Sequence, residues 1–289
     1  MTITHGQAGT KHTPPDDLHT LAEGYIFDLD GTIYLGNDLL PGALHTVRTL
    51  RAQGRRVLFL SNNPTREIGA YVRKLNGLGL DVTPAEILTT VETIVRWVRQ
   101  HHPEATVFPI AEEPVHRALA EAGIRISDDP EQIDIVIASY DRGFVYRKLQ
   151  IAFDAIAVHK RAFLIATNPD RFCPFPGGRG EPDAAAIIGA VEGCTGVRCQ
   201  QVVGKPDPYM LEAALQRLNL PASRCVMVGD RLSTDIRMAV DAGMPSALVL
   251  TGETTPELLA ASDIRPSRVL ARIDELLRPA LREPEDEEN

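Results

Sequence analysis

Cysteine, tryptophan and positive charge are all scarce in this 289-residue sequence. It holds 4 cysteines and 1 tryptophan, and its 30 lysines and arginines are outnumbered by 39 aspartates and glutamates, which gives a net charge of −9. No two cysteines form a Cys-x-x-Cys pair, so neither a zinc ribbon nor a disulfide framework is indicated. Because nucleic-acid and anionic-membrane binders need a surplus of lysine and arginine, the charge balance argues against both classes.

Long apolar runs are missing as well. No stretch approaches the roughly 20 residues that a membrane-spanning helix needs, and residues 1–20 contain no apolar segment of the kind found in a signal peptide. We therefore expect a cytoplasmic protein with a flexible N-terminal tail over 1–20 and an acidic tail over 280–289. The rest is ordinary for a packed protein, with 44% hydrophobic and 24% charged residues.

Short apolar runs alternate with helical patterns along the remaining chain. Tyr25–Phe27 and Val57–Leu60 are typical of central strands in a parallel sheet, and a helix with apolar residues at i, i+3, i+4 and i+7 follows the second run. The alternation continues to the end, where we expect a last helix over Arg268–Leu277. It predicts an α/β fold, with a doubly wound, Rossmann-like core built on a parallel sheet.

The length of the chain favours a second domain inserted into that core. A capping box with proline at the first helical position, Thr83–Glu86, marks the predicted start of the insert. The glycine- and proline-rich segment Pro174–Pro182 marks its return. We assign 21–82 and 181–279 to the core, including helix Ala184–Glu192 and strand Gln201–Val203, and 83–180 to an inserted α/β domain.

Four polar segments each follow an apolar run. They are Asp28-Leu29-Asp30-Gly31-Thr32, Ser61-Asn62-Asn63, Gly204-Lys205-Pro206-Asp207-Pro208, and the stretch from Gly229 to Asp235. In open parallel sheets, ligands bind beyond the carboxyl ends of the strands. We therefore expect all four segments to meet at one edge of the sheet and to form one site.

The chemistry of the first three segments is that of phosphoryl transfer. Asp28 can attack phosphorus as a carboxylate nucleophile, and Asp30 can protonate the leaving oxygen and later activate water. The strand end Ser61-Asn62 offers a hydroxyl and backbone N–H groups that can hold the oxygens of the transferring group. Lys205 can neutralise the charge of the nucleophile and of those oxygens.

Two late aspartates complete the predicted site. Asp230, at a strand end, is a hard oxygen ligand suited to Mg²⁺, which usually takes one or two carboxylates and keeps water and substrate oxygens. Asp235 enters the first turn of the next helix, where the helix dipole favours a carboxylate in any case. We expect Asp235 to hold Lys205 or a metal-bound water.

Taken in this order, the four segments resemble the motifs of the haloacid dehalogenase (HAD) superfamily of phosphotransferases. Further segments are similar to its NagD/4-nitrophenylphosphatase branch: Pro41-Gly42-Ala43, Tyr140-Asp141-Arg142 and Thr167-Asn168-Pro169-Asp170. The resemblance runs from about Tyr25 to Gly252. It implies a phosphatase that works through an aspartyl-phosphate on Asp28, with Asp30 as the acid and base.

The resemblance also implies Mg²⁺ as the cofactor, held by Asp28, the backbone carbonyl of Asp30, and Asp230. Roughly 140 residues separate Asn63 from Lys205, far more than an ordinary connection needs. The resemblance makes this insert a type-two cap, a lid that selects small substrates. Relatives often associate through the cap, which leaves a homodimer open; neither a nucleic acid polymer nor a membrane is an expected partner.

These features predict a phosphomonoesterase for a small phosphorylated metabolite, such as a sugar phosphate, glycerol phosphate or nucleoside monophosphate. The candidate substrate selectors are Asn63, Arg66, Arg142, Arg171 and Phe172. At the cap return, Glu181 and Asp183 replace part of a glycine-rich segment, and this acidic pair could alter lid closure or oppose anionic substrates. Two alternatives stay open: phosphoryl transfer to an acceptor other than water, and a catalytically idle sensor of phosphorylated metabolites.

Overall fold

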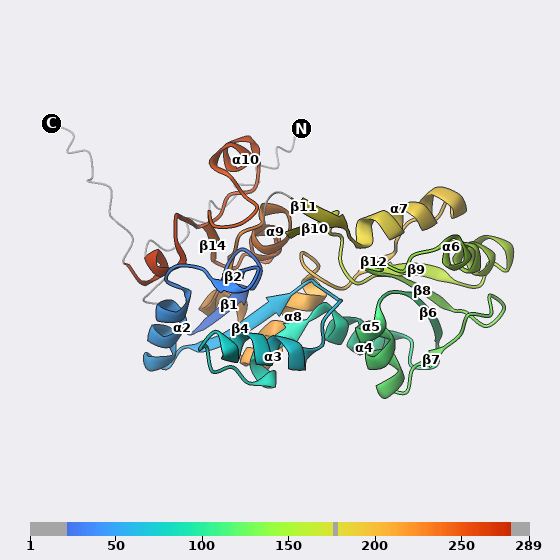
Figure 1. Ribbon diagram of the computed structural model, residues 1–289, viewed down its shortest axis with the longest axis horizontal. Helices are drawn as coiled ribbons and strands as arrows, with labels where there is room; N and C mark the ends of the chain where they lie inside the picture. Colours follow the sequence, from blue (N-terminus) through green and yellow to red (C-terminus); the bar gives the residue numbers. More distant parts are fainter. Residues whose placement is uncertain (1–21, 176–178, 279–289) are drawn as a thin grey trace, which may run out of the picture.

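Two parallel β-sheets organise the computed structural model, which describes residues 22–175 and 179–278 (Figure 1). Within these ranges the first sheet has six strands, in the order β15 (Arg268–Leu270), β14 (Ser246–Val249), β13 (Cys225–Gly229), β1 (Gly24–Asp28), β4 (Arg56–Ser61) and β5 (Ile87–Thr89). The second has five, in the order β12 (Gln201–Val202), β9 (Phe163–Ala166), β8 (Ile135–Ala138), β6 (Thr106–Ile110) and β7 (Arg125–Ile126). The two sheets form neighbouring lobes in Figure 1.

Helices cover both faces of the six-stranded sheet. Two helices pack on one face, α2 (Ala43–Ala52) and α3 (Ile68–Gly77), and two on the other, α8 (Pro208–Leu218) and α9 (Arg237–Asp241). Within β1, Tyr25 and Phe27 belong to the first of these cores and Ile26 to the second. Burial on both faces explains why the strands consist of unbroken apolar runs. The predicted doubly wound, Rossmann-like core is confirmed.

The five-stranded sheet has its own two-sided core. On one face lie α4 (Thr90–His101) and α5 (Glu113–Glu121), and on the other lie α6 (Tyr146–Phe153), the π-helical turn η2 (Asp154–Val158) and α7 (Ala184–Thr195). Val107 faces the first group and Phe108 the second, as the alternation of side chains along a strand requires. The insert is thus an α/β unit with a core of its own.

The remaining elements are short. β2 (Tyr34–Leu35) and β3 (Asp38–Leu39) form an antiparallel hairpin, as do β10 (Phe172–Phe175) and β11 (Arg179–Pro182). Further helical turns are η1 (Pro84–Glu86), η3 (Ala222–Arg224), η4 (Leu232–Ile236) and η5 (Ile273–Leu277). The short helix α10 spans Pro256–Ala261. Over 22–175 and 179–278, no helix is both long enough and apolar enough to cross a membrane.

Strand pairing corrects both predicted borders of the insert. The capping box at Thr83 forms, but it opens only the three-residue turn η1, and β5 then pairs with β4 in the core sheet. At the return, β12 pairs with β9, and α7 packs with α6 on the second sheet. Placing residues 83–89 in the insert and 184–203 in the core was therefore wrong. We propose limits of 22–89 and 204–278 for the core, and 90–203 for the cap.

Two further segments differ from the prediction. The glycine- and proline-rich return is not a plain linker, because β10 and β11 pair across it. The last helix expected over Arg268–Leu277 is instead the edge strand β15, paired with β14, followed by the turn η5. Arg-Val-Leu carries no helical signal of its own, and the open edge of β14 offers it a backbone partner. The predicted tails, 1–20 and 280–289, lie outside the described residues.

Candidate active site

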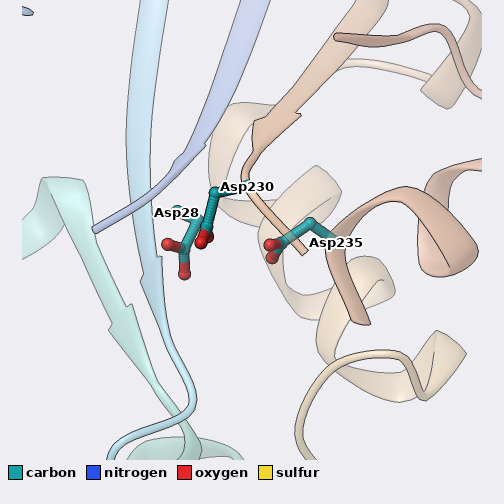
Figure 2. Close-up of side chains that lie close together, drawn as sticks. All are labelled: Asp28, Asp230 and Asp235. Atoms are coloured by element: carbon teal, nitrogen blue, oxygen red, sulfur yellow. The ribbon is translucent and has the colours of Figure 1, made fainter. Parts of the chain in front are cut away.

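The carboxyl ends of the central strands gather the predicted site. In the sheet, β1 lies between β13 and β4, and Asp28 is paired with Leu60, so Asp28, Ser61 and Asp230 leave the sheet at one edge. Carboxylate oxygens of Asp28, Asp230 and Asp235 all lie within 4.8 Å of one another (Figure 2). One cavity is lined by residues of all four predicted segments: Asp28, Asp30, Ser61, Asn62, Asn63, Lys205, Asp230 and Asp235.

Lys205 reaches this edge from the other sheet. It follows β12, and its side chain, only 3% exposed, donates from Nζ to Oδ1 of Asp28 and, at 2.6 Å, to Oδ1 of Asp235. Burial alone would lower the pKa of Lys205. The charges of Asp235 and Asp28 and the hydrogen bonds to both outweigh that effect, so the pKa is raised and the ammonium stays charged.

The clustered carboxylates carry more negative charge than this one ammonium balances. Burial raises the pKa of Asp28 well above its ordinary value, with further increases from Asp235 and Asp230, although Lys205 opposes them. Burial, followed by the charge of Asp235, raises the pKa of Asp230 to about 7. A cluster of this kind favours a bound cation, because a cation stabilises the charged form of each carboxylate.

The surroundings of Asp230 hold its carboxylate in place. The backbone N–H of Glu253 donates to Oδ2 at 2.6 Å. A Cβ at Gly252 would lie 1.9 Å from the same oxygen, and one at Gly31, where φ is +86°, would lie 2.6 Å from it. Both positions therefore need glycine, since any side chain would displace the carboxylate.

The carboxylate oxygens of this cluster fit Mg²⁺, which prefers hard oxygen ligands. Both oxygens of Asp235 already accept protein donors, Oδ1 from Lys205 and Oδ2 from the backbone N–H of Arg231 at 3.1 Å. The carboxylates of Asp28 and Asp230 are those that a cation would contact. The contact of Asp235 with Lys205 is one of the two that the sequence led us to expect. The contact of Asp235 with a metal-bound water and the metal role of the Asp30 carbonyl stay predictions.

Asp30 differs from Asp28 in its environment. Asp28 is buried, whereas Asp30 is exposed to solvent and lines the cavity. The Tyr34 hydroxyl donates to Oδ2 of Asp30 at 3.1 Å. Two carboxylates two residues apart thus lie in contrasting surroundings, an arrangement that suits one to act as a nucleophile and the other to exchange protons.

The strand end at Ser61 is tightly hydrogen-bonded. Ser61 Oγ lies 2.8 Å from the Tyr71 hydroxyl and accepts the Asn63 N–H at 3.2 Å. The Asn62 side chain brackets Lys205, accepting its N–H at 2.8 Å and donating to its carbonyl at 3.0 Å. Because the Asn62 amide is committed to the protein, any contact of Asn62 with phosphate would have to come from its backbone.

The predicted selectors divide into two groups. Asn63 and Phe172 line the cavity, whereas Arg66, Arg142 and Arg171 are not among the described residues that do so. Arg142 is held in ion pairs by Glu112 at 2.8 Å and Glu181 at 2.6 Å. Arg171 lines a neighbouring cavity, and Arg66 is exposed.

The acidic pair at the cap return has structural partners. Glu181 accepts the Tyr140 hydroxyl and the Arg142 guanidinium. Asp183 caps α7, accepting the Ala184 N–H at 2.6 Å, and lines the cavity, where burial raises its pKa to about 6. Both carboxylates thus serve local structure, whatever their effect on substrate choice.

Sequence reasoning missed an ion-pair network that joins the cap to the core. Arg231 contacts Asp170, at the end of the cap sheet, at 3.2 Å and Glu253, in the core, at 2.6 Å. Asp170 also accepts from Asn62 at 3.2 Å. Arg231 directly follows Asp230, so the network connects the loop after β9, in the cap, to the cluster of aspartates in the cavity. The sequence singled out the Thr-Asn-Pro-Asp segment that ends in Asp170, but nothing in it indicated that Arg231 would be the partner of Asp170.

We expect the Asp170–Arg231 pair to matter for stability more than surface ion pairs do. Asp170→Asn should lower the free energy of unfolding by about 1–3 kcal/mol, because it leaves a mostly buried guanidinium short of one partner. Asp128→Asn is the matched control: it breaks a pair with Arg147 whose side chains are 73% and 80% exposed, and should cost less than about 1 kcal/mol. Urea unfolding measures both, and equal losses would contradict the expectation.

Comparison with known proteins places the chain in a family. A model described as haloacid dehalogenase-like hydrolase matches residues 25–125, and a HAD-hydrolase-like model matches 202–276. The acid sugar phosphatase of Staphylococcus haemolyticus is 35% identical over 246 residues, which cover 85% of this chain and 91% of that protein. The chain belongs to the haloacid dehalogenase superfamily.

Other HAD relatives identify its branch. Sugar-phosphatase AraL of Bacillus subtilis is 35% identical over 229 residues, covering 79% of this chain and 83% of that protein. The 4-nitrophenylphosphatase of Thermotoga maritima superimposes with a TM-score of 0.82 at 35% identity, covering 88% of this chain and 96% of that one. NagD of E. coli K-12 superimposes with a TM-score of 0.79 at 26% identity, covering 89% of this chain and 98% of that one. The chain is a phosphatase of the NagD-like branch, as its motifs predicted.

Proposed function

We propose that this HAD phosphatase hydrolyses a small sugar phosphate through an aspartyl-phosphate on Asp28, with Mg²⁺ as cofactor. The observation that carries the proposal is the contact of Lys205 with both Asp28 and Asp235, beside Asp230, in one cavity. Two relatives are named sugar phosphatases, which favours a sugar phosphate over the other small phosphomonoesters.

The first step transfers the phosphoryl group to the protein. Lys205 holds Oδ1 of Asp28 and leaves Oδ2 to attack phosphorus. As the new P–O bond forms, the bond to the leaving oxygen breaks, and Asp30 gives its proton to that oxygen. The product alcohol departs, and the phosphoryl group stays on Asp28 as an acyl phosphate.

The second step returns the site to its starting state. Asp30, now a carboxylate, takes a proton from a water molecule as the water oxygen attacks phosphorus. The bond between phosphorus and Asp28 breaks, and inorganic phosphate is released. In this proposal Lys205 and the hydroxyl of Ser61, which line the cavity, hold the phosphoryl oxygens, and Mg²⁺ bound by Asp28 and Asp230 would supply further positive charge there.

Removal of Mg²⁺ should abolish most of the activity. We expect phosphate release from a sugar phosphate to fall at least tenfold after chelation with EDTA and to recover on addition of Mg²⁺. Mg²⁺ should also raise the melting temperature of the protein, since it binds only the folded site. In Asp230→Asn, which removes one carboxylate ligand, the thermal shift should shrink. Full activity after chelation would contradict the proposed cofactor.

The same assay distinguishes hydrolysis from its alternatives. In ¹⁸O-labelled water, hydrolysis should place one labelled oxygen in each phosphate released, because water attacks phosphorus. Transfer to another acceptor would leave the phosphoryl group on an organic product. A sensor would bind phosphorylated sugars and release no phosphate from any of them.

A further inference from the structure

Tyr34 is a buried tyrosine whose only polar side-chain atom faces Asp30. Its ring is 0% exposed, and its hydroxyl donates to Oδ2 of Asp30 at 3.1 Å. The backbone fixes this relation, because the Gly31 N–H donates to the Tyr34 carbonyl at 2.8 Å and Asp30 and Tyr34 form an isolated β-bridge. The start of the β2–β3 hairpin therefore turns the tyrosine back onto the acid of the preceding turn.

A lysine lies against the ring of this tyrosine. Nζ of Lys74, on α3, lies 3.2 Å from the centre of the Tyr34 ring. A cation over an aromatic face draws electron density from the ring. In a phenol this makes the hydroxyl a stronger hydrogen-bond donor. The pair of Lys74 and Tyr34 is thus arranged to strengthen the contact with Asp30.

In this hydrogen bond the phenol is the donor, because a carboxylate oxygen can only accept. Burial, then the charge of Asp30, raises the pKa of Tyr34 well above its ordinary value, so the hydroxyl keeps its proton. While the phenol donates to Oδ2, that oxygen is occupied as an acceptor and Oδ1 is the oxygen of Asp30 left free. The geometry therefore favours Oδ1 for the exchange of protons.

We propose that Tyr34 is a positioning residue that fixes Oδ1 of Asp30 as the oxygen that gives and takes the catalytic proton. In consequence the site is suited to phosphate esters of alcohols, sugar hydroxyls among them, whose leaving oxygen must be protonated as it departs. This rests on the proposed function, in which Asp30 protonates the leaving oxygen and later deprotonates water.

The chemistry of the leaving group provides the test. An alkoxide is a much stronger base than 4-nitrophenolate, so the P–O bond of a sugar phosphate breaks slowly unless a proton arrives at the same moment. 4-Nitrophenolate leaves without that help. A defect in proton delivery should therefore slow the transfer step for sugar phosphates and spare it for the aryl ester, whereas a general structural defect would slow it for both. The later attack of water needs Asp30 with either substrate, so the comparison uses kcat/KM, which reports the steps up to departure of the leaving group.

The experiment compares Tyr34→Phe with the wild-type protein on glucose 6-phosphate and on 4-nitrophenyl phosphate, at saturating Mg²⁺. We expect kcat/KM on the sugar phosphate to fall about 10–100-fold, part of the 10²–10⁴ that acid–base catalysis contributes. On the aryl ester kcat/KM should fall less than about threefold, because Tyr34 acts through Asp30 and the aryl leaving group needs no proton. Asp30→Asn should show the same selectivity, more strongly.

Tyr209→Phe is the matched control, since it deletes a tyrosine hydroxyl that contacts Gln100 outside the cavity. Its ratio of the two kcat/KM values should equal that of the wild type. Equal losses of kcat/KM on both substrates in Tyr34→Phe, or no loss on either, would overturn the role of Tyr34. If Tyr34→Phe does not fold, Lys74→Met carries the test, and an unchanged ratio there overturns it. A wild-type protein that releases phosphate from neither substrate would refute the proposed function instead.

Discussion

Asp28→Asn is expected to lower kcat by about 10⁴-fold or more, because a carboxamide is a poor nucleophile. The substitution keeps the shape of the side chain and an oxygen that can still accept from Lys205. It also removes one of three clustered carboxylates, so the free energy of unfolding should change by no more than about 1 kcal/mol. Steady-state phosphate release and urea unfolding measure the two effects.

The covalent step has a direct readout. Rapid acid quenching of the wild-type protein during turnover should trap a phosphoryl group on the chain that hydroxylamine releases, as expected of an acyl phosphate. Asp28→Asn should trap none. Asp38→Asn is a suitable control, since Asp38 is an exposed aspartate on the nearby β3 strand. A variant at position 28 that keeps more than about a tenth of the wild-type rate would disprove the covalent mechanism.

The parts of the site that the sequence predicted well are those set by local structure. Asp28, Ser61 and Asp230 each end a strand of one parallel sheet, and the carboxyl ends of such strands meet without further information. The polar residues after each apolar run were therefore sufficient to predict which side chains meet at this edge of the sheet. Lys205 was predicted to follow a strand of the same sheet. It reaches the cavity from the cap sheet instead, because the loop after β12 crosses back to the core.

Long-range pairing accounts for what the sequence did not predict. β12 has two residues, too few to carry a preference for either sheet, and its partner β9 decided its place. Arg142 was a reasonable candidate for a substrate selector by its position. Its guanidinium is instead paired with Glu112 and Glu181, which lie 30 and 39 residues away in the sequence. The contact between Arg231 and Asp170 likewise depends on how the cap returns to the core. No local pattern carries such information.

Lys205→Met should impair both folding and turnover. Methionine fills a similar volume but leaves Asp28 and Asp235, which are both buried, without their cationic partner. Breaking a buried pair from one side costs about 3–5 kcal/mol, so the Mg²⁺-free protein should lose stability on that scale. Loss of the positive charge beside the phosphoryl group should lower kcat about 10²–10³-fold. Lys160→Met, at an exposed site, should change stability by less than about 0.5 kcal/mol.

A double variant separates the two roles of Lys205. In Lys205→Met with Asp235→Asn, the second change removes the carboxylate left unpaired by the first, so much of the lost stability should return. Turnover should not return, because the phosphoryl group still lacks the ammonium. Urea unfolding without Mg²⁺ and steady-state kinetics with it measure the two quantities. Recovery of both would mean that Lys205 serves only to balance Asp235, whereas recovery of stability alone assigns Asp235 to holding Lys205 and Lys205 to the chemistry.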